Sequence, residues 1–302
     1  MAVTTFILGA GASKPYGFPI ASELRTAICN APPVFIDRMW EGDKMMTQMA
    51  KEQSKRIATA LRASGQASID AWLAQQPQHA EWGKTAIAMH LLPVEARCLA
   101  SDTEDWYSWF FRRYQVKGGL NFANVRVVTF NYDRSLEMFL VQACMNSFGM
   151  TLDQAVSHVG QLPLVHVYGT FAAPALQSHF TNRVRLHLEV FVEASKGILT
   201  MNDEREAADR AVATARKFID EARHVVFLGF GFDEANLARI GAHRARAAWV
   251  MRKGQVDCLG SAYGMLEGER MLARMRIGIE PKFGIPTYGC YELLRSAVTW
   301  ED

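Results

Sequence analysis

The chain has 302 residues, of which 49% are hydrophobic, so it can bury a large core as one α/β domain or as one domain with an insert. Its net charge of +2 gives no signal for nucleic acid or for an acidic membrane surface. The five cysteines are scattered and form no C-x-x-C pair, which argues against a structural zinc site and against a disulfide framework. No segment reaches the ~18 apolar residues of a membrane span, so we expect a cytoplasmic protein.

The first predicted strand, Thr4–Leu8, breaks into a glycine-rich turn, Gly9 to Ser13, before a helix from Ile20 to Cys29. A strand, a tight turn and a helix in this order place backbone N–H groups where a phosphate can bind. The dinucleotide fingerprint has a third glycine where this chain has Lys14. A turn without any ligand therefore stays open as the alternative, and Lys14 also weighs against a dehydrogenase.

Helical periodicity prevails from Val34 to Gln115, with helix caps expected at Ser68 and Asp102. Strands then return as apolar runs that alternate with helices: 125–130, 164–168, 198–201, 225–228 and 255–259. This alternation predicts a Rossmann-like, doubly wound parallel sheet with a helical insertion. We expect one domain over 1–302, with its core at 1–33 and 118–302 and the insert at about 34–117.

Polar residues follow two of these runs at what should be one edge of the sheet. Asn131 and Asp133 follow the strand at 125–130, and a carboxylate beside an amide suits the hydroxyl groups of a ribose. The alternative is an Asn/Asp turn that only caps the helix starting at Ser135. His166 and Tyr168 are two residues apart and should share a face, where His166 could take a proton from a hydroxyl or a water. A histidine buried for packing is the alternative for His166.

Taken together, these motifs resemble the sirtuin-like (silent information regulator) superfamily, and specifically its zinc-free bacterial branch found among anti-phage defence NADases. The resemblance rests on Gly9-Ala10-Gly11-Ala12-Ser13 with Gly17-Phe18-Pro19, on Thr129-Phe130-Asn131-Tyr132-Asp133, and on Leu228-Gly229-Phe230-Gly231. It implies NAD as the substrate, no metal, and hydrolysis of the nicotinamide–ribose bond to nicotinamide and ADP-ribose. Besides NAD⁺, a homo-oligomer or an activating partner protein is open as a partner.

The resemblance also implies roles for individual residues. Asn131 would position the water or the ribose, and Asp133 would bind the nicotinamide ribose. The cofactor-binding set implied is Gly9, Ala10, Gly11, Ser13, Phe18, Pro19, Asn131, Asp133, Gly169, Gly229 and Phe230. The family's catalytic histidine directly precedes a glycine, and here Tyr168 stands before Gly169. Proton transfer therefore falls to His166 or Tyr168, or the chain is a catalytically weakened NAD⁺ or ADP-ribose sensor or scaffold.

Overall fold

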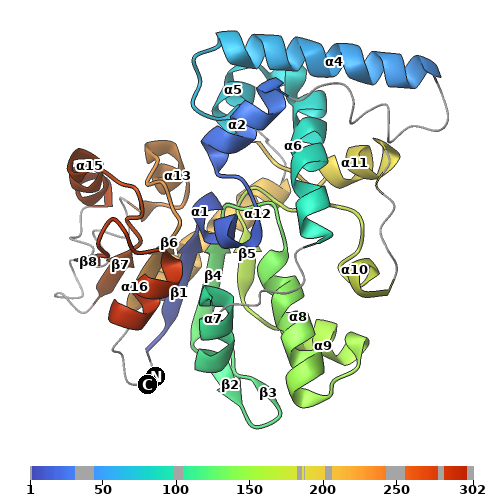
Figure 1. The fold of residues 1–302 in the computed structure, drawn as a ribbon. Helices are drawn as coiled ribbons and strands as arrows, with labels where there is room; N and C mark the ends of the chain where they lie inside the picture. Colours follow the sequence, from blue (N-terminus) through green and yellow to red (C-terminus); the bar gives the residue numbers. More distant parts are fainter. Residues whose placement is uncertain are drawn as a thin grey trace.

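The computed structural model describes residues 2–30, 44–97, 105–181, 186, 188–200, 206–242, 256–277 and 282–297. At its centre is a parallel six-stranded sheet with helices on both faces (Figure 1). The strands are β1 (Thr4–Leu8), β4 (Val125–Thr129), β5 (Leu164–His166), β6 (His224–Leu228), β7 (Asp257–Gly260) and β8 (Lys282–Phe283). Their order in the sheet, β5-β4-β1-β6-β7-β8, is the third-second-first-fourth-fifth-sixth order of doubly wound dinucleotide-binding folds. The predicted Rossmann-like fold is confirmed.

Strand β1 lies at the middle of the sheet, and all five of its residues are buried. Thr4 pairs with Val125 of β4 on one side and with His224 of β6 on the other. Helices cover both faces of a parallel sheet, so its central strands are apolar on both sides, which explains the short unbroken apolar runs in the sequence.

Side chains of β1 alternate between two helical layers. Phe6 and Leu8 face a core shared with α7 (Trp106–Tyr114), α8 (Ser135–Phe148) and α16 (Cys290–Ala297). Ile7 faces a second core shared with α12 (Glu206–Glu221), α13 (Glu234–Arg239) and α15 (Glu267–Ile277). Helix α9 (Leu152–Val159) packs beyond α8, beside a hairpin of β2 (Gln115–Val116) and β3 (Gly119–Leu120).

A third core belongs to a group of helices above the sheet, which we call the helical lobe (Figure 1). Its members are α2 (Ala21–Asn30), α4 (Lys44–Ala63), α5 (Ile69–Gln75), α6 (Ala80–Glu95) and α11 (Leu188–Ser195). The remaining short elements are α1 (Ala10–Ser13), α10 (Ser178–Thr181) and the single turns Lys14–Tyr16 and Pro77–His79. In the part of the chain described, no helix is both long and apolar enough to cross a bilayer.

The packing divides the chain differently from the predicted insert at 34–117. Helix α7 lies within that range but packs on the sheet, because Trp106 and Phe110 share the core of Phe6. Helices α2 and α11 lie outside the range but pack in the helical lobe. Periodicity marks which residues of a helix are buried but not what they are buried against, and this is the reason for the difference.

Of two expected helix caps and one expected strand, only the cap at Ser68 is confirmed. Ser68 caps α5, since its Oγ accepts a hydrogen bond from the Ala71 N–H at 3.1 Å. Asp102 lies outside the described residues, and the cap of α7 is Asp105, which accepts from the Ser108 N–H at 2.9 Å. The predicted strand at 198–201 is wrong for residues 198–200, which form no strand, and Ile198 makes only an isolated antiparallel bridge to Gly169. Met201 is not among the described residues.

The turns that follow β1 and β6 pack backbone against backbone. Gly229, the first residue after β6, has a φ of +56°, and a Cβ there would lie 1.9 Å from the Ala12 nitrogen. A Cβ on Gly11 would likewise lie 2.8 Å from the Gly229 Cα. Only glycine fits such an approach, so the two turns hold each other in place.

We therefore expect Gly229→Ala to lower the free energy of unfolding by about 3 kcal/mol or more, through the clash and the left-handed backbone. Gly231→Ala is the matched control, because a Cβ there meets nothing within 4 Å, and its effect should stay within about 0.5 kcal/mol. Urea unfolding of the two variants measures both values. Equal stability of the two would contradict the close packing of the turns.

Candidate functional site

Most of the residues that the sequence analysis singled out follow the carboxyl ends of β1, β4 and β6, which are neighbours in the sheet (Figure 1), whereas His166, Tyr168 and Gly169 lie at the end of β5. The chain winds in one direction from β1 through β4 to β5 and in the other from β6 to β8, so the sheet reverses between β1 and β6. Open parallel sheets bind ligands in the crevice at this reversal. The Gly9–Ser13 turn and Gly229 lie at this reversal, in direct backbone contact with each other.

Asn131 is hydrogen-bonded to the Gly9–Ser13 turn. Its Nδ2 atom donates to the Gly9 carbonyl oxygen at 3.0 Å and to the Ser13 Oγ at 2.9 Å. A backbone carbonyl only accepts, so this contact fixes which end of the Asn131 amide carries the nitrogen. The Asn131 Oδ1 atom accepts no hydrogen bond from the described residues, which leaves it to accept from a water or a sugar hydroxyl.

Asp133 continues the same chain of hydrogen bonds. The Ser13 hydroxyl donates to the Asp133 Oδ1 at 3.2 Å, and the Ser135 hydroxyl and N–H donate to the same oxygen. The carboxylate is buried, and burial, with the charges of Glu95 and Glu137, raises the pKa of Asp133 to about 6 despite the bonds from Ser135. At neutral pH it is therefore a buried carboxylate held at a free-energy cost, which is typical of functional sites.

The amides of the glycine-rich turn differ from the expectation of bare N–H groups. Gly9 N–H donates to the Leu228 carbonyl, Gly11 N–H to the Gly229 carbonyl and Ala12 N–H to the Gly9 carbonyl, all at 2.9–3.0 Å. These three amides are thus used within the protein, and the glycines serve the packing of two turns. Ser13, one of the implied cofactor-binding residues, joins Asn131 to Asp133.

Both ring nitrogens of His166 are hydrogen-bonded. Its Nδ1 lies 2.8 Å from the Asn131 carbonyl oxygen and its Nε2 lies 2.9 Å from the Glu137 Oε1. Burial acts to lower the pKa of His166, but the charge and hydrogen bond of Glu137 outweigh it and hold that pKa above its ordinary value. A ring that faces two acceptors carries both protons, so His166 fits the role of a cation that holds the Asn131 backbone better than that of a general base.

The prediction that His166 and Tyr168 share a face is wrong. Strand β5 ends at His166, and a turn closed by the Gly169 N–H and the His166 carbonyl, 3.1 Å apart, follows it. Strand alternation therefore does not extend to Tyr168. The Tyr168 hydroxyl donates to the Asn236 Oδ1 of α13 at 2.6 Å, and its ring lies 5.0 Å below the Arg239 guanidinium.

The remaining predicted binding residues differ in how deeply they are buried. Phe18 is buried in the core of the helical lobe, and Phe230 is buried between the rings of Phe130 and Phe227, at 5.1 and 5.5 Å. Neither phenylalanine presents an open face for a ligand in this arrangement. Ala10 and Pro19 are half-buried, and Gly169 packs against the Gly197 backbone, where a Cβ would lie 2.1 Å from the carbonyl oxygen.

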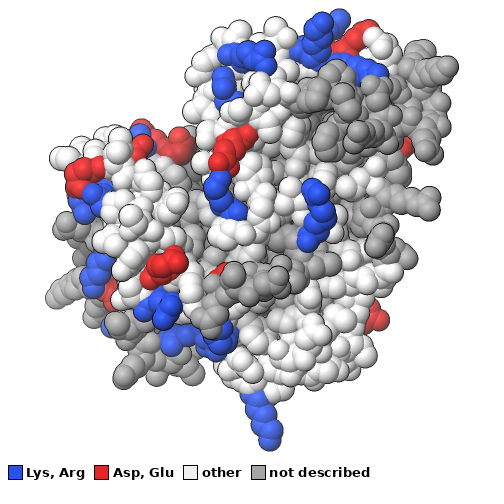
Figure 2. Space-filling model, in the orientation of Figure 1, with Lys and Arg blue, Asp and Glu red and all other residues white. Residues whose placement is uncertain are grey.

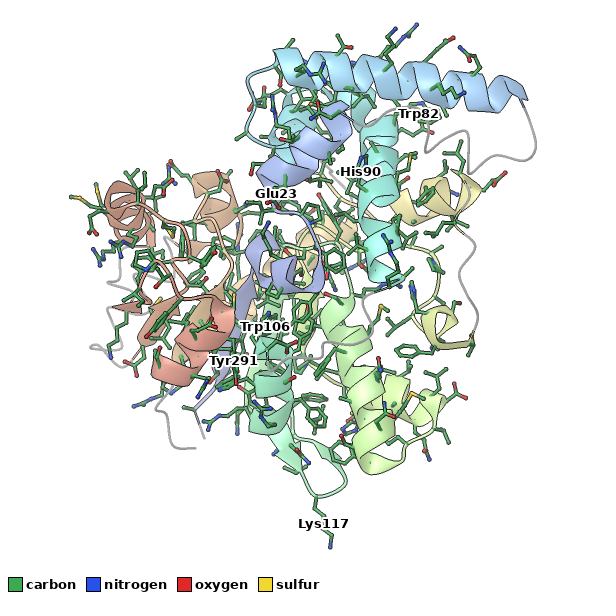
Figure 3. All side chains as sticks on the ribbon, in the orientation of Figure 1. Glu23, Trp82, His90, Trp106, Lys117 and Tyr291 are labelled. Carbon is green, nitrogen blue, oxygen red and sulfur yellow. The ribbon has the colours of Figure 1, made fainter. Side chains whose placement is uncertain are left out.

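Sequence reasoning missed Trp106, which anchors the glycine-rich turn. Its indole Nε1–H donates to the Ala12 carbonyl at 2.7 Å, and its side chain is buried next to α1 (Figure 3). A buried tryptophan needs a partner for its N–H, but the sequence offers no means of naming that partner. Glu137 was missed for a similar reason, because an acidic residue in the first turn of a helix reads only as a helix start.

A buried ion pair ties the helical lobe to the loop that carries Asp133. Glu95, the last residue of α6, accepts from the Arg134 guanidinium at 2.6 and 3.2 Å and from the Arg134 N–H at 2.7 Å. His179 of α10 contacts the same carboxylate at 3.3 Å. Burial acts to raise the pKa of Glu95, but His179 and Arg134 hold it below its ordinary value. Arg134 therefore fixes the Asp133 loop against two other elements.

The surface around these elements carries mixed charge. On the face that Figure 2 shows, lysine and arginine side chains of the described residues lie scattered, several of them beside acidic ones. Among the described residues, no group of three or more His, Cys, Asp or Glu side chains is arranged to hold a metal ion. A surface groove of about 590 Å³ between the end of α8 and α9 lies apart from the crevice and is lined by residues 148–161.

Comparison with known proteins gives no assignment. No family model matches the sequence, and no curated protein matches it.

The raised pKa of Asp133 predicts a pH-dependent stability. A buried carboxyl with a raised pKa binds its proton more tightly in the folded than in the unfolded state. Asp133 therefore lowers the free energy of unfolding increasingly as the pH rises from about 4 to 6, and by a constant amount above about pH 6. Asp133→Asn should unfold with roughly 1–3 kcal/mol more stability than the wild type at pH 7.5, and the gain should disappear near pH 4. Urea unfolding at the two pH values measures this, and a gain that is equal at both would contradict it.

The His166–Glu137 contact predicts a charged ring. A raised histidine pKa gives stability that is present below the unfolded pKa and is lost as the pH rises through the folded one. Glu137→Gln should lower the pKa of His166, seen by NMR titration of its ring, and reduce stability at pH 6 by about 1–2 kcal/mol. Glu206→Gln, at an exposed carboxylate of α12, serves as the control. An unchanged His166 titration in Glu137→Gln would show that Glu137 does not charge the ring.

Proposed function

We propose that this protein hydrolyses NAD⁺ at the nicotinamide–ribose bond, releasing nicotinamide and ADP-ribose. The observation that carries the proposal is the hydrogen-bonded chain Asn131–Ser13–Asp133, placed where the strand order reverses. The amide of Asn131 and the carboxylate of Asp133 come from the loop after β4, and Ser13, from the turn after β1, joins them. The resemblance to sirtuin-like NADases supports the same substrate and the same pair of residues.

Cleavage of the nicotinamide–ribose bond needs no general acid. The nicotinamide of NAD⁺ is a cationic pyridinium. When its bond to the ribose breaks, the electron pair of that bond stays on the ring nitrogen, so nicotinamide leaves as a neutral molecule and needs no proton. Positive charge then develops on the ribose, and a water attacks the anomeric carbon. In our proposal the Asn131 Oδ1 accepts a hydrogen bond from that water, and the Asp133 carboxylate faces the ribose and stabilises its charge.

The attacking water must lose one proton, and the reaction yields one proton for each NAD⁺ consumed. Asp133, with a pKa of about 6, is ionised at neutral pH and is a suitable acceptor. The tyrosine before Gly169 is then no obstacle, because its hydroxyl bonds to Asn236 and Asp133, in the loop after β4, supplies the base. Burial raises the pKa of Tyr168 further, which makes it a poor base.

The resemblance further supports a role as an effector of bacterial anti-phage defence, in which NAD⁺ depletion stops phage growth. Within this proposal the protein acts in the cytoplasm, where its substrate is found. That role would be supported if phage-infected cells with the wild-type protein release nicotinamide and infected cells with the Asn131→Ala variant do not.

A second candidate function is an NAD⁺ or ADP-ribose sensor without turnover. The observation in its favour is that both candidate proton-transfer side chains are engaged elsewhere, His166 with Glu137 and Tyr168 with Asn236. A sensor of this kind would show a ligand-dependent rise in melting temperature, because binding to the native state stabilises it. Purified protein that melts higher with NAD⁺ and releases no nicotinamide would favour this function over hydrolysis.

We expect Asn131→Ala to lower nicotinamide release from NAD⁺ by about 100-fold or more, because the attacking water loses its positioning group. Asn146→Ala, at an exposed position near the end of α8, is the matched control and should keep wild-type activity. In the wild type, kcat/KM should fall on the acid side with a midpoint near the Asp133 pKa of about 6. Equal background release by all three proteins, with and without candidate activators, would rule out hydrolysis.

A further inference from the structure

Helix α15 lies at the outer edge of the molecule (Figure 1), and exposed apolar side chains gather on it and on the loops beside it. Six of the eight large apolar side chains that are exposed in the described part of the chain gather in this segment: Tyr263, Leu266, Met271, Leu272, Met275 and Ile285. The Gly264 N–H donates to the Pro286 carbonyl, which holds the two loops together. We call these six residues the edge patch. Contiguous exposed apolar side chains indicate an interaction surface.

Helix α15 has one buried and one exposed face. Ala273 and Ile277 are buried against the sheet, whereas Met271 and Met275 are 60% and 66% exposed. Gly268 lies on the same exposed face as the two methionines, and a Cβ there would meet nothing within 4 Å. Positions 268, 271, 272 and 275 follow the a, d, e, a spacing of a helix–helix seam.

Charges at the two ends of α15 have opposite sign. Glu267 and Glu269 are in the first turn, and Arg274 and Arg276 are in the last. An antiparallel second helix of the same sequence would place acidic residues beside basic ones at both ends of the contact. The apolar seam is also complementary to a second copy of itself, because Met275 then lies level with Gly268 of the second helix. Met271 likewise lies level with Leu272 of the second helix.

We propose that the edge patch is the interface of a symmetric dimer in which α15 of one copy packs antiparallel to α15 of the other. Glu267 of each copy lies on the same flank of the seam as Arg274 of the second copy. This two-fold contact is closed, as expected for an isologous interface. The methionine and leucine side chains contribute most of the affinity, and the charges determine which orientation is allowed, because like charges placed opposite each other are strongly unfavourable.

The charged groups around the patch are already partly balanced within one chain. Arg270 contacts Glu267, Arg274 lies 3.8 Å from Glu267, and Arg276 lies 3.9 Å from Glu234. The patch therefore carries no net excess of one sign, which fits a second copy better than an acidic surface. With eleven residues, α15 is about 16 Å long, so we expect a weak dimer that forms with rising concentration.

The test uses charge reversal and mixing. Sedimentation velocity of the full chain should show a monomer–dimer equilibrium between roughly 1 and 100 µM. Glu267→Arg alone and Arg274→Glu alone should each be monomeric, since like charges then face each other. An equimolar mixture of the two variants should form dimers again, because each reversed charge meets its opposite in the other variant.

Lys117→Glu is the control, because Lys117 projects from the β2–β3 hairpin, far from α15 (Figure 3), and it should dimerise like the wild type. Met271→Asp with Met275→Asp should also be monomeric, and circular dichroism melting confirms that each variant is folded. A wild type that stays monomeric throughout would overturn the proposal. Reversal variants that dimerise alone, or folded variants whose mixture stays monomeric, would overturn it as well.

Discussion

The close approach of two backbones fixes the turns at the carboxyl ends of β1 and β6 relative to each other. Gly229 lies so near Ala12 and Gly11 that neither turn can shift without moving the other. Because the Gly9 N–H and Gly11 N–H donate to carbonyls of the β6 end, the carbonyl of Gly9 is in turn held where Asn131 can bind it. The position of the Asn131 amide is thus set by one main-chain carbonyl, that of Gly9, together with the buried Ser13 hydroxyl.

From that fixed amide, a chain of hydrogen bonds leads to Asp133, whose ionised form is destabilised by burial. Ser13 accepts from Asn131 and donates to Asp133, so one hydroxyl orders both functional groups. The carboxylate is kept charged at neutral pH against its burial and against two acidic neighbours. A protein with no use for this charge would be more stable with a neutral residue there, and this is the physical case for function at Asp133.

The sequence predicts the sheet well because its central strands are short, apolar and bounded by glycine or polar turns. It also places Asn131 near the Gly9–Ser13 turn, since carboxyl ends of parallel strands meet at one edge. The fate of His166 could not be predicted, because the turn to Gly169 and the contact with Glu137 depend on tertiary packing. The glycines were assigned to a phosphate, whereas the structure uses Gly11 and Gly229 to bring two turns together, and both needs leave the same pattern in a sequence.

The buried contact of Glu95 with Arg134 determines how the helical lobe can move. Separating the two would leave an uncompensated charge in the interior, which costs about 3–5 kcal/mol. Swinging of the lobe away from the sheet would then occur in fewer than about one molecule in a hundred at any moment. The helical lobe and the Asp133 loop should consequently move together, and a partner that displaces α6 would also displace the Asp133 carboxylate.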